Sequence, residues 1–310
     1  MVSILVPVYN ASRYLRECVS SLTGQTYADL QIVLINDGST DDSWNIMQEL
    51  ARQDKRIEIY SQPNCGVAAT RNRLLEKALG EFVLFVDSDD WIDLDTIETL
   101  NNERLLYGAD MVVCNSPIEG IWDRENAVKE FLWHREFRGM LWNKLIKRVH
   151  FENKSFNETV SLGEDALMVW QIIQQVNCIR LTNRILYHYR ENENSLSRLR
   201  FNEKKFSAYT TWDAISSDAD VAWPQYSDIA HARFACEMTQ ILLDASRCGY
   251  KSNAGIELLQ DVVRHDASLI VKTGISSWKM NVFAWLVSHC YWLARIISPY
   301  IIRNDMDISD

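Results

Sequence analysis

The feature that most constrains the fold is an alternation of short apolar runs with helical patterns along the first third of the chain. Runs rich in β-branched residues predict strands at 3–8, 30–35, 56–60, 81–86 and 110–115. Between them, apolar residues recur with helical spacing. Strands that alternate with helices imply right-handed crossovers. The sequence therefore predicts an α/β fold with a mostly parallel sheet.

Two residues carry signals for helix ends. Ser12 is expected to cap a first helix that contains Leu15 and Leu22. Gly80 is expected at the C′ position of a third helix that contains Val67 and Ala78. A second helix is expected to run to about Leu50, and a fourth over about 94–106.

Polar clusters follow three of the expected strands. They read Tyr9-Asn10, Asn36-Asp37-Gly38 and Asp87-Ser88-Asp89-Asp90. In parallel sheets of this kind, ligands bind outside the carboxyl ends of the strands. We therefore expect the three clusters to converge on one rim, which is the candidate binding site.

The rim lacks the glycine-rich signatures of dinucleotide-binding and P-loop proteins. Clustered carboxylates repel one another unless a cation neutralises them, and hard oxygen ligands suit Mg²⁺ or Mn²⁺. A metal that bridges a diphosphate is the simplest interpretation. The alternative is that Asp90 caps the next helix and Asp87 closes a turn.

Four motifs then occur in order along the chain. They read SILVPVYN from Ser3, INDGSTD from Ile35, GVAATRN from Gly66 and FVDSDD from Phe85. Together they resemble the inverting nucleotide-sugar glycosyltransferases of family two, which have the GT-A fold.

That resemblance implies a set of nucleotide-sugar-binding residues: Pro7, Val8, Tyr9, Asn10, Asp37, Arg71, Asp87 and Ser88. The first four would line the base and ribose. Asp37 would accept a hydrogen bond from the base, which favours uracil, and Arg71 would face the diphosphate. Asp87 and Ser88 would lie near the ribose, with Asp89 as the metal ligand. The alternative for Arg71 is an ordinary solvated charge on a helix.

Displacement at an anomeric carbon needs a base that takes the proton of the acceptor hydroxyl. Glu164 and Asp165 open an expected helix, where the helix dipole would also favour acids. The resemblance implies that Asp165 is this base. We favour it over Glu164 because neighbouring helix positions lie about 100° apart, so that only one carboxylate can face the substrate.

Three further residues lie in segments that resemble acceptor and closing regions of the family. Trp142 could stack on a sugar ring or pack in the core, and Lys144 could bind a phosphate. His188 could be a third metal ligand, although a histidine between two tyrosines more often packs or forms a hydrogen bond.

From about residue 201 the pattern becomes helical. Residues 267–304 contain four basic residues and no acidic one, and Trp278, Trp285 and Trp292 recur every seven positions. The apolar run is too interrupted for a membrane span, which needs about 20 predominantly apolar residues. Two interpretations remain: peripheral membrane contact through 278–302, or a helix that packs on the catalytic domain or forms a homodimer.

Composition argues against nucleic-acid-binding and disulfide-rich classes of protein. The net charge of −10 argues against a general nucleic-acid partner. Seven scattered cysteines without C-x-x-C spacing argue against a disulfide framework and favour the cytoplasm, with the inner membrane face as a possible surface.

The sequence thus predicts a GT-A domain over 1–200 and a helical region over 201–310. The expected activity is metal-dependent, inverting, non-processive transfer of a hexose or N-acetylhexosamine from a UDP-sugar to a glycan or lipid-linked saccharide. Such an enzyme would serve bacterial polysaccharide biosynthesis. The alternative is a non-catalytic module that binds a nucleotide sugar or polysaccharide.

Overall fold

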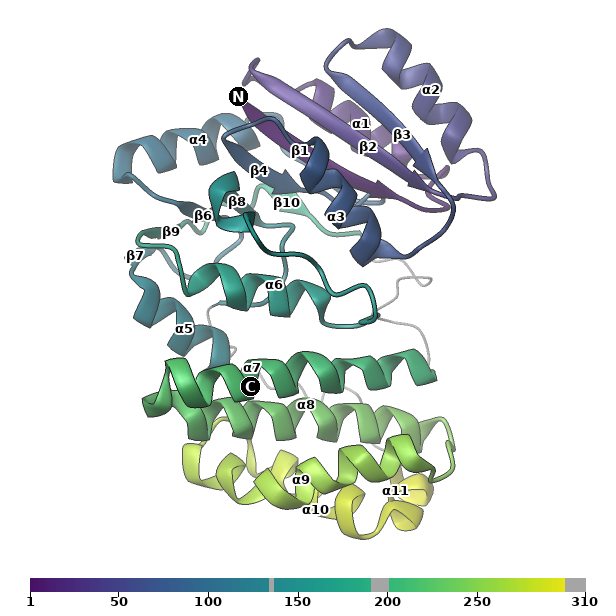
Figure 1. Ribbon diagram of the computed structural model, residues 1–310, viewed down its shortest axis with the longest axis vertical. Helices are drawn as coiled ribbons and strands as arrows, with labels where there is room; N and C mark the ends of the chain where they lie inside the picture. The colour runs from purple at the N-terminus through teal and green to yellow at the C-terminus, as the bar shows by residue number, and fades with distance from the viewer. Residues whose placement is uncertain (134–136, 191–200, 299–310) are drawn as a thin grey trace. The chain divides into compact units, whose positions relative to one another are not determined.

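The computed structural model describes residues 1–133, 137–190 and 201–298. The chain forms two compact units (Figure 1). The sheet unit comprises Met1–Val128, Gly139–Glu158 and Glu164–Glu191. The helical unit comprises Lys129–Arg138, Thr159–Gly163 and Asn192–Asp310. The expected boundary at residue 200 falls within 191–200, outside the described residues.

An eight-stranded sheet with the order β3-β2-β1-β4-β8-β6-β9-β7 organises the sheet unit. Its strands are β1 (Val2–Val8), β2 (Leu30–Asp37), β3 (Ile57–Gln62), β4 (Phe82–Phe85), β6 (Met111–Val113), β7 (Gly120–Trp122), β8 (Lys144–Lys147) and β9 (Ile179–Leu181). Pairing is parallel from β3 through β2 and β1 to β4. Only β8 and β7 pair antiparallel with their neighbours, so the predicted mostly parallel α/β sheet is confirmed.

The central strands are buried on both faces, which explains their almost continuous apolar sequences. In register, Val8 lies opposite Asn36, and Leu5 lies opposite Phe85. The polar residues that follow β1, β2 and β4 therefore lie together at the carboxyl ends of these parallel strands.

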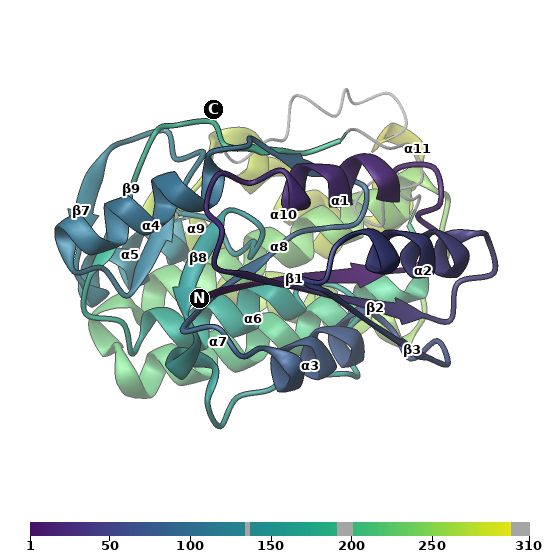
Figure 2. The same ribbon diagram turned by 90° about the horizontal axis from the view of Figure 1, so that it is seen from above.

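Helices cover both faces of this sheet (Figure 2). They are α1 (Leu15–Thr23), α2 (Ser43–Gln53), α3 (Val67–Lys77), α4 (Thr96–Tyr107) and α6 (Glu164–Ile173), while α5 (Arg124–Trp133) crosses the division between the units. Apolar residues of α1, α2 and α4 share one core cluster with β1, β2 and β4. The opposite face of β1 and β2 is covered by α3.

Both expected helix caps are wrong. The first helix begins only at Leu15, and the backbone N–H of Ser12 instead donates to Asp41. The third helix ends at Lys77, and Gly80 is not in the left-handed region. Gly80 is needed for close approach, because a Cβ there would lie 2.5 Å from the backbone nitrogen of Ser3.

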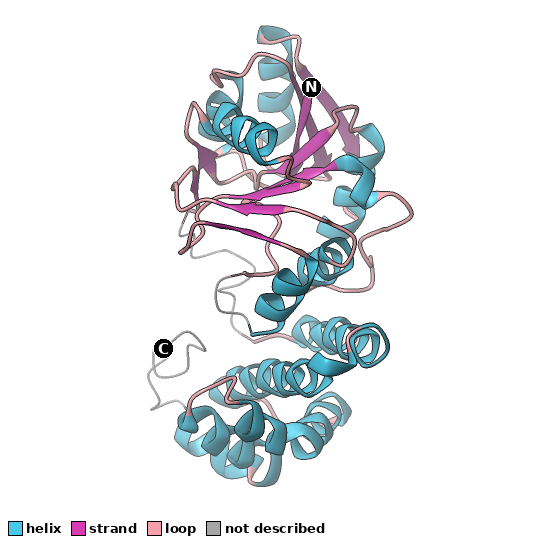
Figure 3. Ribbon diagram, turned by 90° about the vertical axis from the view of Figure 1, so that its left-hand side faces the viewer, coloured by secondary structure: helices cyan, strands magenta, loops and turns pink. Residues whose placement is uncertain are grey.

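The helical unit is a layered bundle (Figure 3). Its main helices are α7 (Ala208–Ala222), α8 (Ser227–Arg247), α9 (Ala254–Thr273), α10 (Trp278–His289) and α11 (Tyr291–Ile297). Within it, α8 contacts the other four and is buried along most of its length. Among the described residues, no helix combines the length and apolarity that crossing a membrane requires.

Candidate active site

The loops after β1 and β2 are tied together by side-chain-to-backbone hydrogen bonds. Asn10 adopts a left-handed conformation with φ of 49°. Its Oδ1 accepts from the backbone N–H of Thr40 at 2.8 Å, and its own N–H donates to Ser39 Oγ at 3.0 Å. These bonds fix one side of the rim that the sequence predicts.

The residues expected to line the base differ in the exposure of their side chains. Tyr9 is exposed and Pro7 is partly buried, so both side chains are accessible to a ligand. Val8 belongs to the core cluster and is fully buried. The expectation for Val8 is corrected in this respect: its side chain faces the core, so that only its backbone can contact a nucleotide.

Asp37 organises the loop that leads into α3. One carboxylate oxygen accepts from Gln62 Nε2 at 2.9 Å and from the backbone N–H of Cys65 at 3.0 Å. The other accepts from the N–H of Gly66 at 2.9 Å. Gly66 has φ of 92°, which only glycine adopts readily. Asp37 therefore sets the start of α3, the helix that carries Arg71.

The centre of the site is a cluster of three carboxylates around the buried guanidinium of Arg71. Nη1 of Arg71 donates to Glu164 Oε1 at 2.8 Å and to Asp165 Oδ1. Nη2 lies 3.6 Å from Asp87 Oδ1. The cluster brings together α3, the end of β4 and the start of α6, and its acids outnumber its bases by two.

This excess of negative charge shifts the protonation of the cluster. Burial raises the pKa of Asp165 to about 7, with the nearby carboxylates adding to the rise against the opposing effect of Arg71. Burial also raises the pKa of Asp87. A pKa in this range suits a general base.

Two expectations about this cluster need correction. Adjacent helix positions do not separate the two acids, because both carboxylates reach the same nitrogen of Arg71. Arg71 is neither a solvated charge nor directed at an open phosphate site, since its guanidinium is buried among the acids.

Asp89 is the residue that could hold a cation. Within the described chain its carboxylate makes no hydrogen bond or ion pair, while its backbone oxygen accepts from Arg190 Nε at 2.8 Å. Among the described residues, no three histidine, cysteine or acidic side chains form a metal-binding group. A cation such as Mg²⁺ can be bound by one carboxylate and fill its remaining coordination positions with phosphate oxygens and water.

Asp90 is fully buried and is not a helix cap, because α4 begins only at Thr96. Its carboxylate accepts from Tyr187 Oη at 2.6 Å and from the backbone N–H of Arg190 at 2.7 Å. Tyr187 Oη in turn accepts from the N–H of Asp87 at 3.1 Å. Burial raises the pKa of Asp90 to about 7. Sequence reasoning missed Tyr187, since nothing local to it indicates a partner 97 residues away.

His188 lies in a short second sheet formed by β5 (Trp91–Ile92) and β10 (Tyr187–His188). Its Nε2 is 2.8 Å from Asp93 Oδ1, and its ring stacks on Trp91 at 5.2 Å. His188 is thus engaged in ring stacking and a hydrogen bond, which favours the packing interpretation over a third metal ligand.

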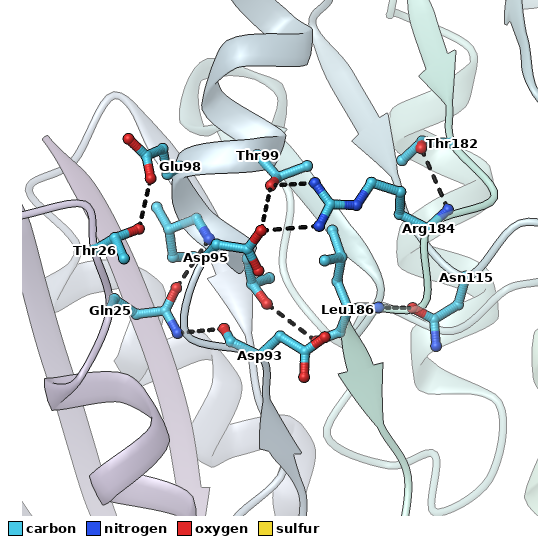
Figure 4. Close-up of polar contacts among 12 residues, drawn as sticks. Gln25, Thr26, Asp93, Asp95, Glu98, Thr99, Asn115, Thr182, Arg184 and Leu186 are labelled. Carbon is cyan, nitrogen blue, oxygen red and sulfur yellow. Dashed lines mark hydrogen bonds and ion pairs between the residues drawn. The ribbon is translucent and has the colours of Figure 1, made fainter.

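A polar network holds β10 in place (Figure 4). Asn115 Oδ1 accepts from the N–H of Leu186 at 2.9 Å. Arg184 donates to Asp95 at 2.8 Å and to Thr99 at 2.9 Å. Through β10, the network fixes Tyr187 next to the Asp87–Asp90 loop.

The segment with Trp142 and Lys144 is structural. Trp142 packs against the core cluster with its ring 4.6 Å from that of Tyr187. Lys144 is buried, and its ammonium donates to the carbonyl of Met140 at 2.6 Å and to Asn143 Oδ1 at 2.8 Å. Burial lowers its pKa to about 7. These contacts favour the core interpretation of Trp142 and correct the expectation that Lys144 reaches a phosphate.

Comparison with known proteins gives consistent matches. The family model Glycosyl transferase family 2 matches residues 3–161. Glycosyltransferase GlyA of Streptococcus pneumoniae is 31% identical over 98% of this chain, and the putative glycosyltransferase EpsH of Bacillus subtilis is 34% identical over 67%. The chain spans 48% of the length of GlyA and 65% of that of EpsH.

Solved structures share the fold. Residues 1–349 of Staphylococcus aureus TarS, in complex with UDP-GlcNAc, match with a TM-score of 0.72 at 18% identity, covering 96% of this chain and 90% of that one. The mannosyltransferase PcManGT of Pyrobaculum calidifontis, in complex with GDP-Man and Mn²⁺, matches with a TM-score of 0.52 at 15% identity, covering 96% and 86%.

Proposed function

Since this chain belongs to glycosyl transferase family 2, we propose that it transfers a hexose or N-acetylhexosamine from a UDP-sugar, with inversion, to a hydroxyl of a glycan or lipid-linked saccharide. The reaction is non-processive and depends on Mn²⁺ or Mg²⁺. The related chains named glycosyltransferases and chondroitin synthase support a role in bacterial polysaccharide synthesis.

One observation carries the proposal: three carboxylates surround the single guanidinium of Arg71. Burial, together with the charges of Glu164 and Asp87, raises the pKa of Asp165 to about 7, so this carboxylate can accept a proton at physiological pH.

In the proposed reaction, Asp165 takes the proton of the acceptor hydroxyl. The hydroxyl oxygen forms a bond to the anomeric carbon while the bond to the nucleoside diphosphate breaks, and the configuration inverts. Arg71 and Glu164 position Asp165 through the contacts described above.

Asp89 would hold the divalent cation, which supplies positive charge to the departing diphosphate. Asp87 and Ser88 lie in the same loop, next to the ribose in this proposal. The hydrogen bond from the Asp87 N–H to Tyr187 Oη and the one from Arg190 Nε to the Asp89 carbonyl keep Asp89 in place for that role.

UDP is the proposed nucleotide because the family resemblance implies that Asp37, at the end of β2, accepts a hydrogen bond from the base. The complex of TarS with UDP-GlcNAc supports this choice through the shared fold. Tyr9 is exposed beside it and would contact the base or ribose.

The test is donor hydrolysis by the full chain with a panel of UDP-sugars and GDP-mannose, in Mn²⁺ and in EDTA. We expect one UDP-sugar to be hydrolysed, only with metal, and the activity to be lost in Asp89→Ala. Glu76→Ala, which changes an exposed acid on α3, is the matched control and should retain activity. Binding of a UDP-sugar without turnover in any acceptor mixture would favour the non-catalytic module, and turnover of GDP-mannose alone would overturn the UDP assignment.

A further inference from the structure

The helices α10 and α11 present a row of large apolar side chains to solvent. Trp278, Trp285 and Trp292 are 71%, 57% and 66% exposed, and Val282 and Ile296 are also exposed. Trp278, Val282 and Trp285 are four and three residues apart within α10 and so lie on one side of that helix. Trp292 and Ile296 are four residues apart within α11, after the break at Cys290. We call these five residues the Trp face.

The opposite side of the same helices already has its packing partners. Met280, Ala284, Val287, Tyr291 and Ala294 are buried within the helical unit. The Trp face is therefore not needed for the bundle core. Exposed apolar patches of this kind usually mark a binding surface.

The charges around the Trp face indicate which surface it binds. No acidic residue occurs over 267–304, although the whole chain has a net charge of −10. Lys272 lies on α9 and pairs with Asp228, whereas Lys279 on α10 and Arg295 on α11 have no acidic residue on their own helices. Two copies of the chain meeting through this face would bring these cations together, whereas an anionic surface would be attracted to them.

Tryptophan is also the side chain that best suits a bilayer interface, because its ring is largely apolar and its N–H seeks a polar partner. We propose that the Trp face binds the surface of a bilayer that contains anionic lipid, with α10 and α11 lying in the headgroup region. The inference rests on the helical unit alone and does not require the proposed donor or acceptor.

The test is flotation of the full chain with vesicles of phosphatidylcholine, with and without phosphatidylglycerol. We expect binding to the anionic vesicles, weakened by added salt, and a loss of about tenfold or more in the double variant Trp285→Ser/Trp292→Ser. The matched control is Leu106→Ser/Val221→Ser, which removes two side chains that are 72% and 84% exposed on other helices. It should bind like the wild type.

Circular dichroism establishes that both variants are folded. Sedimentation velocity on the same samples shows whether a second copy of the chain binds the Trp face instead. A dimer that Trp285→Ser/Trp292→Ser converts to a monomer, without vesicle binding by the wild type, would assign the face to a second copy and overturn the proposal. Equal vesicle binding by the wild type and the Trp variant would overturn it as well.

Discussion

The surroundings of Asp165 have opposing effects on its pKa. Burial and the neighbouring acids favour its protonated form, while Arg71 favours the ionised form. The resulting pKa of about 7 lies far above that of an ordinary aspartate. Such a value suits a group that must gain and lose a proton in each catalytic cycle.

Replacing Asp165 with Asn should therefore remove the base and leave the fold intact. We expect kcat to fall by about 100- to 10,000-fold, the usual contribution of general base catalysis. In the wild type, kcat/KM should fall as the pH drops below about 7, because the base works only when it is ionised. A pH profile of sugar transfer measures both effects. Unchanged kcat in Asp165→Asn, with Glu76→Gln as the control, would exclude this role.

At the scale of elements, the α3–β4 connection lies in close contact with the start of β1. Gly80 packs against Ser3, whose Oγ accepts from the N–H of Gly80 at 2.8 Å and donates to Gln31 at 2.6 Å. This contact seats β4 beside β1, and the Asp87–Asp90 loop follows directly from β4.

We expect Gly80→Ala to destabilise the sheet unit by about 1–3 kcal/mol, the usual range for overpacking. The added Cβ would lie 2.5 Å from the Ser3 nitrogen and 2.9 Å from the Phe82 oxygen, both backbone atoms that cannot move aside cheaply. Urea unfolding gives the free-energy difference. Gly120→Ala is the control, since its nearest neighbour would be 3.8 Å away, and an equal loss in both variants would refute the steric explanation.

At the scale of the whole molecule, a histidine with two acidic partners links three helices of the helical unit. In the helical unit, His231 on α8 joins α7 to α9. It lies 3.1 Å from Asp220 and 3.3 Å from Asp266. The hydrogen bond with Asp266, reinforced by Asp220, raises the pKa of His231 from 6.5 to about 9.

The stability of the helical unit should consequently depend on pH. Because the folded-state pKa is raised, the contribution of His231 is complete below about pH 6.5 and is lost as the pH rises through about 9. We expect His231→Gln to cost about 1–3 kcal/mol at low pH and much less above pH 9. Urea unfolding of the full chain at several pH values measures this difference. A cost that stays constant with pH would show that the ion pairs contribute nothing.

The sequence by itself determined the alternation of strands and helices, the parallel strands at the centre of the sheet and the polar rim. These features follow from local periodicity, together with the rule that parallel strands end at one edge. Asp37, Asp87 and Asp89 could be placed there because Asp37 ends β2, and Asp87 and Asp89 lie in the loop just after β4. Their individual roles still came from the family resemblance.

Only the tertiary structure decided which side chains meet. Arg71 pairs with Glu164 and Asp165 across more than 90 residues, and Tyr187 bonds to Asp90 across 97. The insertion of β8 between β4 and β6 buries Lys144, which no local pattern indicates. Burial and charge pairing depend on all neighbours in space, and these neighbours are set by packing between segments distant in sequence.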